Sequence, residues 1–230
     1  MVKKFGLTNN QLKLLAMLAM LCDHAGKVLL PQYTFLQIIG RIAFPIFAFM
    51  VAEGCFYTRN KIKYFLSVFL LGVGCQAVFF IAERSFYQNI LITFSLSVAL
   101  IFALENYKNK RNKPSLAVMF FTVALVLTVT VAFPALFKEQ GFYVDYGIWG
   151  VLLPVAVFYA PDKERKLLFA TGMLILLAFS AGSRQWFSLL AVPLLALYNQ
   201  KRGKYNIKPL FYIFYPAHLA AIHLISLLLQ

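Results

Sequence analysis

The segment LKLLAMLAMLCDHAGKVLL, residues 12–30, decides the expected fold because it is an almost continuous apolar run. A hydrocarbon core about 30 Å thick is crossed by about 20 apolar residues that rise about 1.5 Å each. A second run, FLQIIGRIAFPIFAFMVAEGCFY at residues 35–57, follows after a short turn. Both runs predict transmembrane helices, and both carry charged residues that are rare inside membranes.

The composition of the whole chain agrees with a membrane protein. Of its 230 residues, 61% are hydrophobic and 13% are charged, against about 45–50% and about 25% in soluble domains. The 22 basic and 8 acidic residues stand in small groups between apolar runs, whereas a nucleic-acid binder needs a contiguous basic face. The three cysteines lack the spacing of metal or redox motifs. We therefore expect no nucleic-acid partner and no metal.

Apolar runs recur along the entire sequence, which predicts an all-α, polytopic transmembrane helical bundle forming a single domain over residues 1–230. Nine spans fit best, and short sixth to eighth runs leave eight or ten possible. The expected spans are residues 12–30, 35–57, 64–82, 89–105, 115–137, 146–160, 166–181, 184–198 and 209–229.

The loop charges predict how this bundle is oriented. With a cytoplasmic N-terminus, seventeen basic residues fall inside and four outside, which is the bias of the positive-inside rule and places the C-terminus outside. The inside residues are Lys3, Lys4, Lys13, Arg59, Lys61, Lys63, Lys108, Lys110, Arg111, Lys113, Lys163, Arg165, Lys166, Lys201, Arg202, Lys204 and Lys208, and the outside ones are Lys27, Arg84, Lys138 and Arg184.

Six ionisable residues within the expected spans are candidates for function. Inserting a charge at the centre of a membrane costs at least about 2.5–3.5 kcal/mol of free energy. Such a residue persists mainly when it is ion-paired, faces a water-filled cavity or has a function. Two ion pairs are possible among them and their neighbours. Asp23 and Arg41 both lie about 10 Å below the outer membrane surface, and Glu53 and Lys13 lie at a common depth near the cytoplasmic side. The six residues are Asp23, His24, Arg41, Glu53, His218 and His223.

Lys13 and His24 are the most informative pair. They stand eleven residues apart, about three helical turns, so they share one helix face with about 16 Å between them. A cation at the cytoplasmic mouth below a buried imidazole suits a long ligand with phosphates and a reactive tip, such as acyl-coenzyme A. The alternative is a neutral core histidine beside an ordinary membrane-edge lysine. His218 and His223 bracket the depth of His24 and are candidates for its cavity.

Several motifs of this sequence resemble the TraX family. The resemblance begins with residues 12–17, Met20 and Asp23-His24, and continues with residues 41–49, Ala52-Glu53-Gly54 and Thr58-Arg59. It extends through Asn89 to Thr93-Phe94, Asp145-Tyr146-Gly147, Gly150 and residues 211–219 with Tyr215. The family includes the enzyme that acetylates the N-terminus of F-type pilin during conjugation. The wider group resembles acyltransferase family 3, whose first helix carries a basic residue, ten further positions and a histidine, as Lys13 and His24 do.

The resemblance implies an acyl-CoA-dependent acyltransferase in the bacterial cytoplasmic (inner) membrane. It would move an acetyl group from cytoplasmic acetyl-CoA, its co-substrate, to an amine or hydroxyl acceptor such as pilin or a cell-envelope glycan, with membrane lipid around it. Lys13, Arg59, Lys61 and Lys63 would hold the coenzyme A phosphates. The expected catalytic group is His24, Asp23, Glu53 and His218, and the expected site-shaping residues are Arg41, Asn89, Thr93, Asp145 and Tyr215.

Within that group, His24 would act as general base or form an acyl-imidazole. Asp23, its neighbour in sequence, points about 100° away and would work through Arg41, so Glu53 or His218 is the better candidate to orient the ring. Two alternatives remain open. One is a proton-coupled transporter that uses the buried charges as a relay, and the other is a non-catalytic membrane scaffold.

Overall fold

The computed structural model describes residues 6–205 and 207–229, which are mainly α-helical. Lys3 and Lys4, assigned to the cytoplasmic side, lie outside these residues, as do residues 206 and 230. The described chain forms two compact units. The first takes in the described parts of Met1–Met50 and Leu174–Gln230, and the second is Val51–Met173. Helices α3 and α9 each continue from one unit into the other.

The first unit is built around α1, Asn9–Val28. Thr8 caps this helix, because its hydroxyl accepts a hydrogen bond from the Gln11 backbone while the Gln11 side chain accepts one from the Thr8 backbone. The other helices of this unit are α2 (Thr34–Gly40), the start of α3 (Ala43–Tyr57), the end of α9 (Lys163–Ala181), the 3₁₀ helix η2 (Ser183–Leu190), α10 (Ala191–Ala196) and α11 (Lys208–Leu228).

Helices α1 and α2 pack closely because small residues lie between them. A Cβ atom added to Gly26 would lie 2.8 Å from the Leu36 Cβ, and one added to Gly40 would clash with the Asp23 side chain. Glycine at position 40 therefore allows the backbone of α2 to approach the carboxylate on α1.

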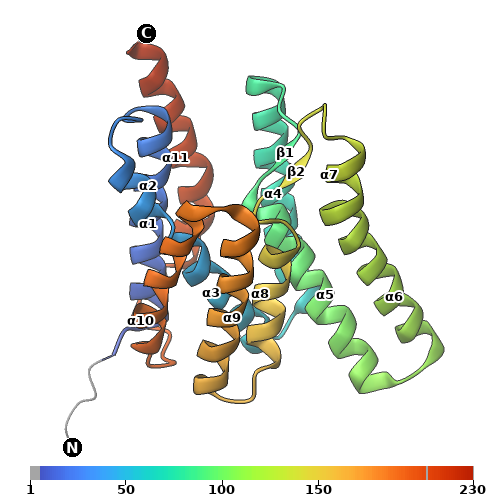
Figure 1. The fold of residues 1–230 in the computed structure, drawn as a ribbon. Helices are drawn as coiled ribbons and strands as arrows, with labels where there is room; N and C mark the ends of the chain where they lie inside the picture. The colour runs from blue at the N-terminus through green and yellow to red at the C-terminus, as the bar shows by residue number, and fades with distance from the viewer. Residues whose placement is uncertain (1–5, 206, 230) are drawn as a thin grey trace, which may run out of the picture. The chain divides into compact units, whose positions relative to one another are not determined.

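Helices α1 and α11 run in the same direction (Figure 1). Near the start of both helices, Lys13 Nζ lies 5.0 Å from the ring centroid of Phe211. Further along both, the ring of His24 contacts the ring of His218. The two residues that were expected to share one face of α1 thus both face α11.

The second unit centres on α5 (Ile90–Lys110), which packs against α4, α6 and α8. Its core contains fully buried Val98, Ile101 and Val151. Buried hydroxyls join α5 to α8, since Ser97 Oγ donates to the Val151 carbonyl at 2.9 Å. The remaining elements are α4 (Lys61–Glu83), β1 (Tyr87–Gln88), α6 (Lys113–Leu127), the π-helical turn η1 (Thr128–Ala132), α7 (Phe133–Leu136), β2 (Tyr143–Val144) and α8 (Gly147–Tyr159). The two short strands pair in parallel.

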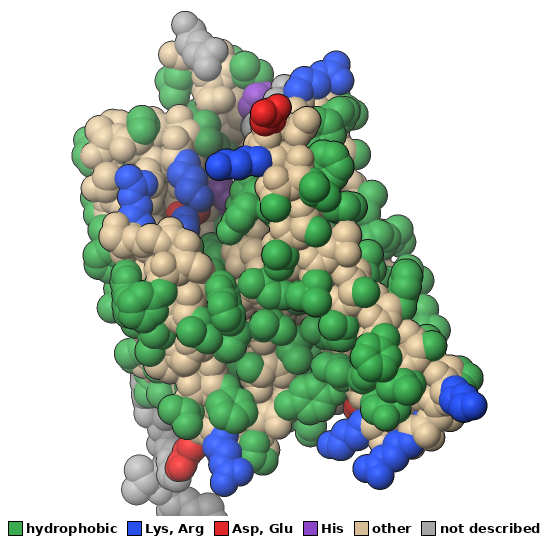
Figure 2. Space-filling view, turned by 45° about the vertical axis from the view of Figure 1, so that its right-hand side comes forward, with side chains coloured by type: hydrophobic (Ala, Val, Ile, Leu, Met, Phe, Trp, Pro, Cys, Tyr) green, Lys and Arg blue, Asp and Glu red, His purple; other side chains and the backbone are tan. Residues whose placement is uncertain are grey.

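The fold is that of an all-α membrane protein. Among the described residues, five helices are long and apolar enough to cross a membrane: Thr34–Tyr57, Lys61–Ile81, Ile90–Lys110, Lys113–Leu136 and Pro209–Leu228. Figure 2 shows hydrophobic side chains over much of the surface in view, which suits contact with lipid. The nine expected spans all contain helix, and the number of crossings stays a prediction.

Three of the expected spans are interrupted rather than continuous. The second changes from α2 to α3 at Arg41-Ile42, the fifth contains the π-helical turn η1, and the eighth joins the 3₁₀ helix η2 to the short α10. Such irregular backbone is tolerated at membrane depth where protein or a cavity surrounds it. The first and last of these irregular segments, residues 41–42 and η2, belong to the unit that contains His24.

Candidate functional site

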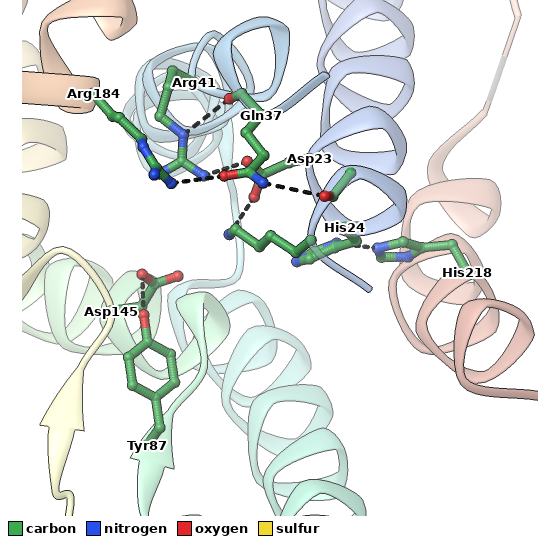
Figure 3. A network of polar contacts seen from close by, with 10 residues as sticks. Asp23, His24, Gln37, Arg41, Tyr87, Asp145, Arg184 and His218 are labelled. Carbon is green, nitrogen blue, oxygen red and sulfur yellow. Dashed lines mark hydrogen bonds and ion pairs between the residues drawn. The ribbon is translucent and has the colours of Figure 1, made fainter. Parts of the chain in front are cut away.

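The side chains of His24 on α1 and His218 on α11 form a hydrogen-bonded pair (Figure 3). His24 Nδ1 lies 2.8 Å from His218 Nε2, and the ring centroids are 5.0 Å apart. His218 is buried with 5% exposure, whereas His24 is only partly buried. The structure therefore brings together two of the four residues expected to form the catalytic group.

The backbone of α11 determines which nitrogen atoms of this pair carry protons when both rings are neutral. His218 Nδ1 lies 2.8 Å from the Phe214 carbonyl oxygen, and because a carbonyl can only accept, Nδ1 must be the protonated nitrogen. The His218 Nε2 atom is then an acceptor, so His24 Nδ1 donates to it. This leaves the unprotonated nitrogen of His24 at Nε2.

Aromatic rings on α11 fix the orientation of the His218 ring. The Phe214 ring stacks on it with centroids 4.7 Å apart and planes 9° apart, and the Tyr215 ring meets it edge-on at 5.7 Å. Tyr215, expected to shape the site, thus contacts a histidine directly. Pro216 lies within the same helix turn. His223 is exposed one turn further along.

Asp23 forms the ion pair with Arg41 that the sequence left open, and a second one with Lys27. Asp23 Oδ2 lies 2.5 Å from Lys27 Nζ, and its Oδ1 atom binds the Arg41 guanidinium. The carboxylate is 9% exposed, so it is nearly desolvated and its two partners offset the cost of burying its charge. Asp23 is thereby engaged with α2 and with its own helix.

An amide extends this network to the 3₁₀ helix η2. Gln37 Oε1 accepts a hydrogen bond from Arg184 Nη1 at 2.9 Å, and Gln37 Nε2 donates to the Gly26 carbonyl at 3.1 Å (Figure 3). We name Asp23, Lys27, Gln37, Arg41 and Arg184 the polar cluster. Lys27 and Arg184 were predicted only as outer loop charges. The spacing of Asp23 and Lys27, four residues apart on one helix, was the signal that could have revealed their pairing.

The start of α1 is hydrogen-bonded to residues 201–202, in the segment that precedes α11. Backbone hydrogen bonds join Asn9 to Lys201 and Asn10 to Arg202 at 2.8 Å and 3.2 Å. Gly203 has a φ of +99°, and a Cβ atom there would lie 2.8 Å from Asn10 Nδ2, so glycine is required. Exposed Lys201, Arg202 and Lys204 therefore lie at the same end of α1 as Lys13, although the sequence suggested only a topological role for them.

The other basic residues expected to bind coenzyme A belong to the second unit. Lys61 Nζ lies 2.5 Å from Glu105 Oε2, so a carboxylate already neutralises it. Arg59 and Lys63 are exposed at the start of α4. Of these three cations, Arg59 and Lys63 are better placed than Lys61 to meet a phosphate.

Glu53 is also in the second unit, where its carboxylate is 3% exposed. Glu53 Oε1 lies 2.5 Å from Lys166 Nζ, and the same ammonium group lies 5.4 Å from the Phe56 ring centroid. Lys166 was assigned only to the cytoplasmic charge bias. This ion pair supports a packing role for Glu53 between α3 and α9.

The remaining motif residues join α5 to the connection before α8. The Asn89 side chain caps α5 by accepting from the Leu91 backbone, and Thr93 Oγ1 donates to the Asp145 carbonyl at 2.7 Å. The Tyr87 hydroxyl donates to Asp145 Oδ1 at 2.5 Å. Burial of that hydroxyl end and the negative charge of Asp145 raise the pKa of Tyr87. Asn89, Thr93 and Asp145 thus hold the second unit together.

The described residues contain no group of three or more His, Cys, Asp or Glu side chains placed to hold a metal ion. The first unit brings together two imidazoles and, around Asp23, several cations. A hydrogen-bonded imidazole with a free Nε2 can accept a proton or attack a carbonyl carbon.

Comparison with known proteins gives the chain a family. The TraX protein family model matches residues 8–226. A probable fimbrial assembly protein, FimC of serogroup H1 from Dichelobacter nodosus, is 27% identical, with 96% of each chain covered. An uncharacterized protein, RP591 of Rickettsia prowazekii (strain Madrid E), is 29% identical over 81% of this chain and 69% of its own. No solved structure matches. Because the match covers nearly the whole sequence, this protein belongs to the TraX family.

Proposed function

We propose that this protein is a membrane-bound acetyltransferase that moves an acetyl group from acetyl-CoA to an amine or hydroxyl acceptor. The observation that carries the proposal is the hydrogen-bonded series from the Phe214 carbonyl through His218 to His24. It fixes the His24 ring with its basic nitrogen, Nε2, directed away from His218. A fixed base of this kind is what acyl transfer to an N–H or O–H group requires.

In the proposed reaction, His24 Nε2 takes the proton from the acceptor as its nitrogen or oxygen attacks the thioester carbonyl carbon. The new bond to the acetyl group forms as the bond from that carbon to sulfur breaks. The coenzyme A thiolate leaves and takes the proton from the His24 imidazolium. His218 stabilises that imidazolium by accepting from Nδ1. The same Nε2 atom would be the nucleophile if the acetyl group passed through an acyl-imidazole.

Acetyl-CoA would enter from the cytoplasm along α1. Lys13 lies on the side of α1 that carries His24, and about 16 Å of helix separates them. A long ligand whose phosphates bind Lys13 would extend its thioester toward the imidazole. Lys201, Arg202 and Lys204, which are held near the start of α1, add positive charge at the same end.

The shared direction of α1 and α11 supports the predicted topology. If both helices cross the membrane in the same direction, an odd number of crossings must connect them. Nine crossings with a cytoplasmic N-terminus satisfy this condition, whereas eight or ten do not. We propose that this chain is a multi-pass protein of the bacterial cytoplasmic membrane.

Pilin is the acceptor that the comparisons favour. The family is named for TraX, which implies acetylation of a pilin N-terminus, and one similar protein is a probable fimbrial assembly protein. A cell-envelope glycan is the alternative acceptor. Purified enzyme, incubated with labelled acetyl-CoA and pilin or envelope glycan, would identify the acceptor by the label it gains.

The decisive experiment is acetyl-CoA binding to the purified protein. We expect acetyl-CoA to raise the unfolding temperature of the wild type and to do so much less for Lys13→Ala. Lys108→Ala is the matched control, because Lys108 is an exposed basic residue near the end of α5 in the other unit. If saturating acetyl-CoA leaves the wild type unchanged, the acetyltransferase proposal fails and the proton-coupled transporter becomes the better explanation of the buried charges.

A further inference from the structure

The polar cluster contains cations that membrane topology does not explain. Lys27 and Arg184 are two of only four basic residues assigned to the outer loops, where the positive-inside rule predicts few. The structure nonetheless gathers both in one network with Arg41, and Lys27 belongs to the helix that carries His24. Their placement together therefore calls for another reason.

Within the polar cluster, three cations stand against a single carboxylate, which binds two of them. Asp23 binds both Lys27 and Arg41, while Arg184 is held by the amide oxygen of Gln37. An amide holds a guanidinium in place without neutralising it. Arg184 thus keeps its full charge and its remaining N–H donors at an exposed position. A fixed, exposed guanidinium is well suited to bind a carboxylate or phosphate.

The helix that carries Arg184 also contains two buried donors without acceptors. Gln185 Nε2 and Ser188 Oγ have no hydrogen-bond partner among the described residues, and both side chains are buried. They stand three residues apart in the 3₁₀ helix η2, so they project from the same face. Such groups are rare in folded proteins and each calls for an explanation. The polar groups of η2 are thus not all satisfied by the described residues.

We propose that the polar cluster binds an oxyanion, a phosphate or a carboxylate, carried by the acceptor of the acetyl group. Arg184 is its main ligand and Lys27 supports it, while Asp23 and Gln37 fix the cations. Lys27 lies three residues beyond His24 on α1, and side chains at this spacing are neighbours on a helix surface, so an acceptor held by its anionic group lies near the base. The acceptor class is therefore an anionic amine or alcohol. The inference rests on the proposed function only in identifying the bound molecule as the acceptor.

The test measures thermal unfolding of the full-length protein in an uncharged detergent at constant ionic strength. Inorganic phosphate is titrated against wild type, Arg184→Gln, Lys13→Ala and Lys138→Gln. Lys138 is the matched control, since it is another exposed residue assigned to the outer side, in the turn after α7. A second series replaces phosphate by phosphatidylglycerol, with phosphatidylcholine as the neutral lipid, which separates a soluble phosphate from a lipid headgroup.

We expect an anion to stabilise the wild type and Lys138→Gln alike, and Lys13→Ala measures the share of the phosphate response that belongs to the start of α1. Arg184→Gln should need at least about tenfold more anion for the same rise in unfolding temperature, as expected for the loss of one charge-assisted hydrogen-bonding group. If only the phosphatidylglycerol series shows this dependence, the oxyanion belongs to a lipid headgroup. If neither series distinguishes Arg184→Gln from wild type, the inference is wrong.

Acetyl-CoA, tested on the same four proteins, separates this inference from the proposed function. Binding of acetyl-CoA that depends on Lys13, together with no effect of Arg184→Gln on the anion, would overturn the anion site alone. An anion effect that depends on Arg184, without any acetyl-CoA binding, would leave the anion site standing and remove the acetyltransferase proposal.

Discussion

His24 Nδ1 and His218 Nε2 share a hydrogen bond of 2.8 Å between two helices that are separated by 194 positions in the sequence. The Phe214 carbonyl fixes the proton positions of this pair, because it accepts from His218 Nδ1. The arrangement resembles that of a catalytic dyad in which one group orients another. The free nitrogen, His24 Nε2, is where proton transfer would occur.

Replacing His24 with alanine should reduce acetyl transfer by at least about 10²-fold, because general bases typically contribute about 10²–10⁴-fold. Acetyl-CoA binding should persist, since Lys13 is intact. The measurement is single-turnover transfer to the labelled acceptor, with thermal unfolding as the check on folding. His223→Ala, an exposed histidine on α11, is the control and should retain wild-type rates. Wild-type turnover by His24→Ala would remove this residue from the mechanism.

His218 is expected to act as a positioning residue, so its variants should differ by hydrogen-bonding capacity. His218→Ala leaves the His24 Nδ1–H without its acceptor, whereas the amide oxygen of His218→Gln can still accept. We expect kcat to fall in both, with the glutamine variant about tenfold faster than the alanine variant, as one hydrogen bond of about 1.4 kcal/mol would give. KM for acetyl-CoA should change little. Equal rates for the two variants would indicate that His218 serves packing alone.

Asp23→Asn should destabilise the first unit more than it changes ligand binding. The substitution leaves the Arg41 guanidinium, whose side chain is 16% exposed, without its carboxylate. Removing one partner of a buried ion pair typically costs about 3–5 kcal/mol. Lys27→Gln should cost much less, because the Lys27 side chain is 47% exposed. Thermal unfolding of both variants checks the order, and an inactive Asp23→Asn protein of wild-type stability would instead assign the carboxylate to the chemistry.

Tyr87→Phe should have a lower unfolding temperature than the wild type at neutral pH, and this difference should disappear at alkaline pH. The tyrosine donates to the Asp145 carboxylate, and a hydrogen bond to a charged group contributes about 1.5–3 kcal/mol. Because the pKa of Tyr87 is raised in the folded state from the usual value of 10.0, its contribution is complete below about pH 10. It is lost as the pH rises further, since the unfolded state ionises first. Unfolding temperatures of the two proteins from pH 7 to pH 11 should therefore converge, and a constant difference would contradict this account.

The sequence was sufficient to predict the helices and the relation of Lys13 to His24. Apolar runs gave the location of each span, and an eleven-residue spacing placed both side chains on the face that meets α11. Both predictions depend only on the rise and rotation per residue of an α-helix, which are set locally along the chain. The breaks at residues 41–42 and in η2 were not predicted, because apolar composition does not distinguish α from 3₁₀ helix.

Partners from distant segments were harder to predict. The Asp23–Arg41 pair followed from depth, yet Lys27 was missed as its second cation. The partners of Glu53, Lys61 and Asp145, namely Lys166, Glu105 and Tyr87, depend on which helices become neighbours. Depth along a membrane restricts the possible pairs, but rotation and packing of the helices select among them.

The pairing of α1 with α11 has a consequence for biogenesis. His24 leaves the ribosome early, but its partner is synthesised 194 residues later. During that interval the nascent chain holds an imidazole without its orienting acceptor. Competence for the proposed transfer would then arise only after insertion of α11, so a chain truncated before His218 would be inactive.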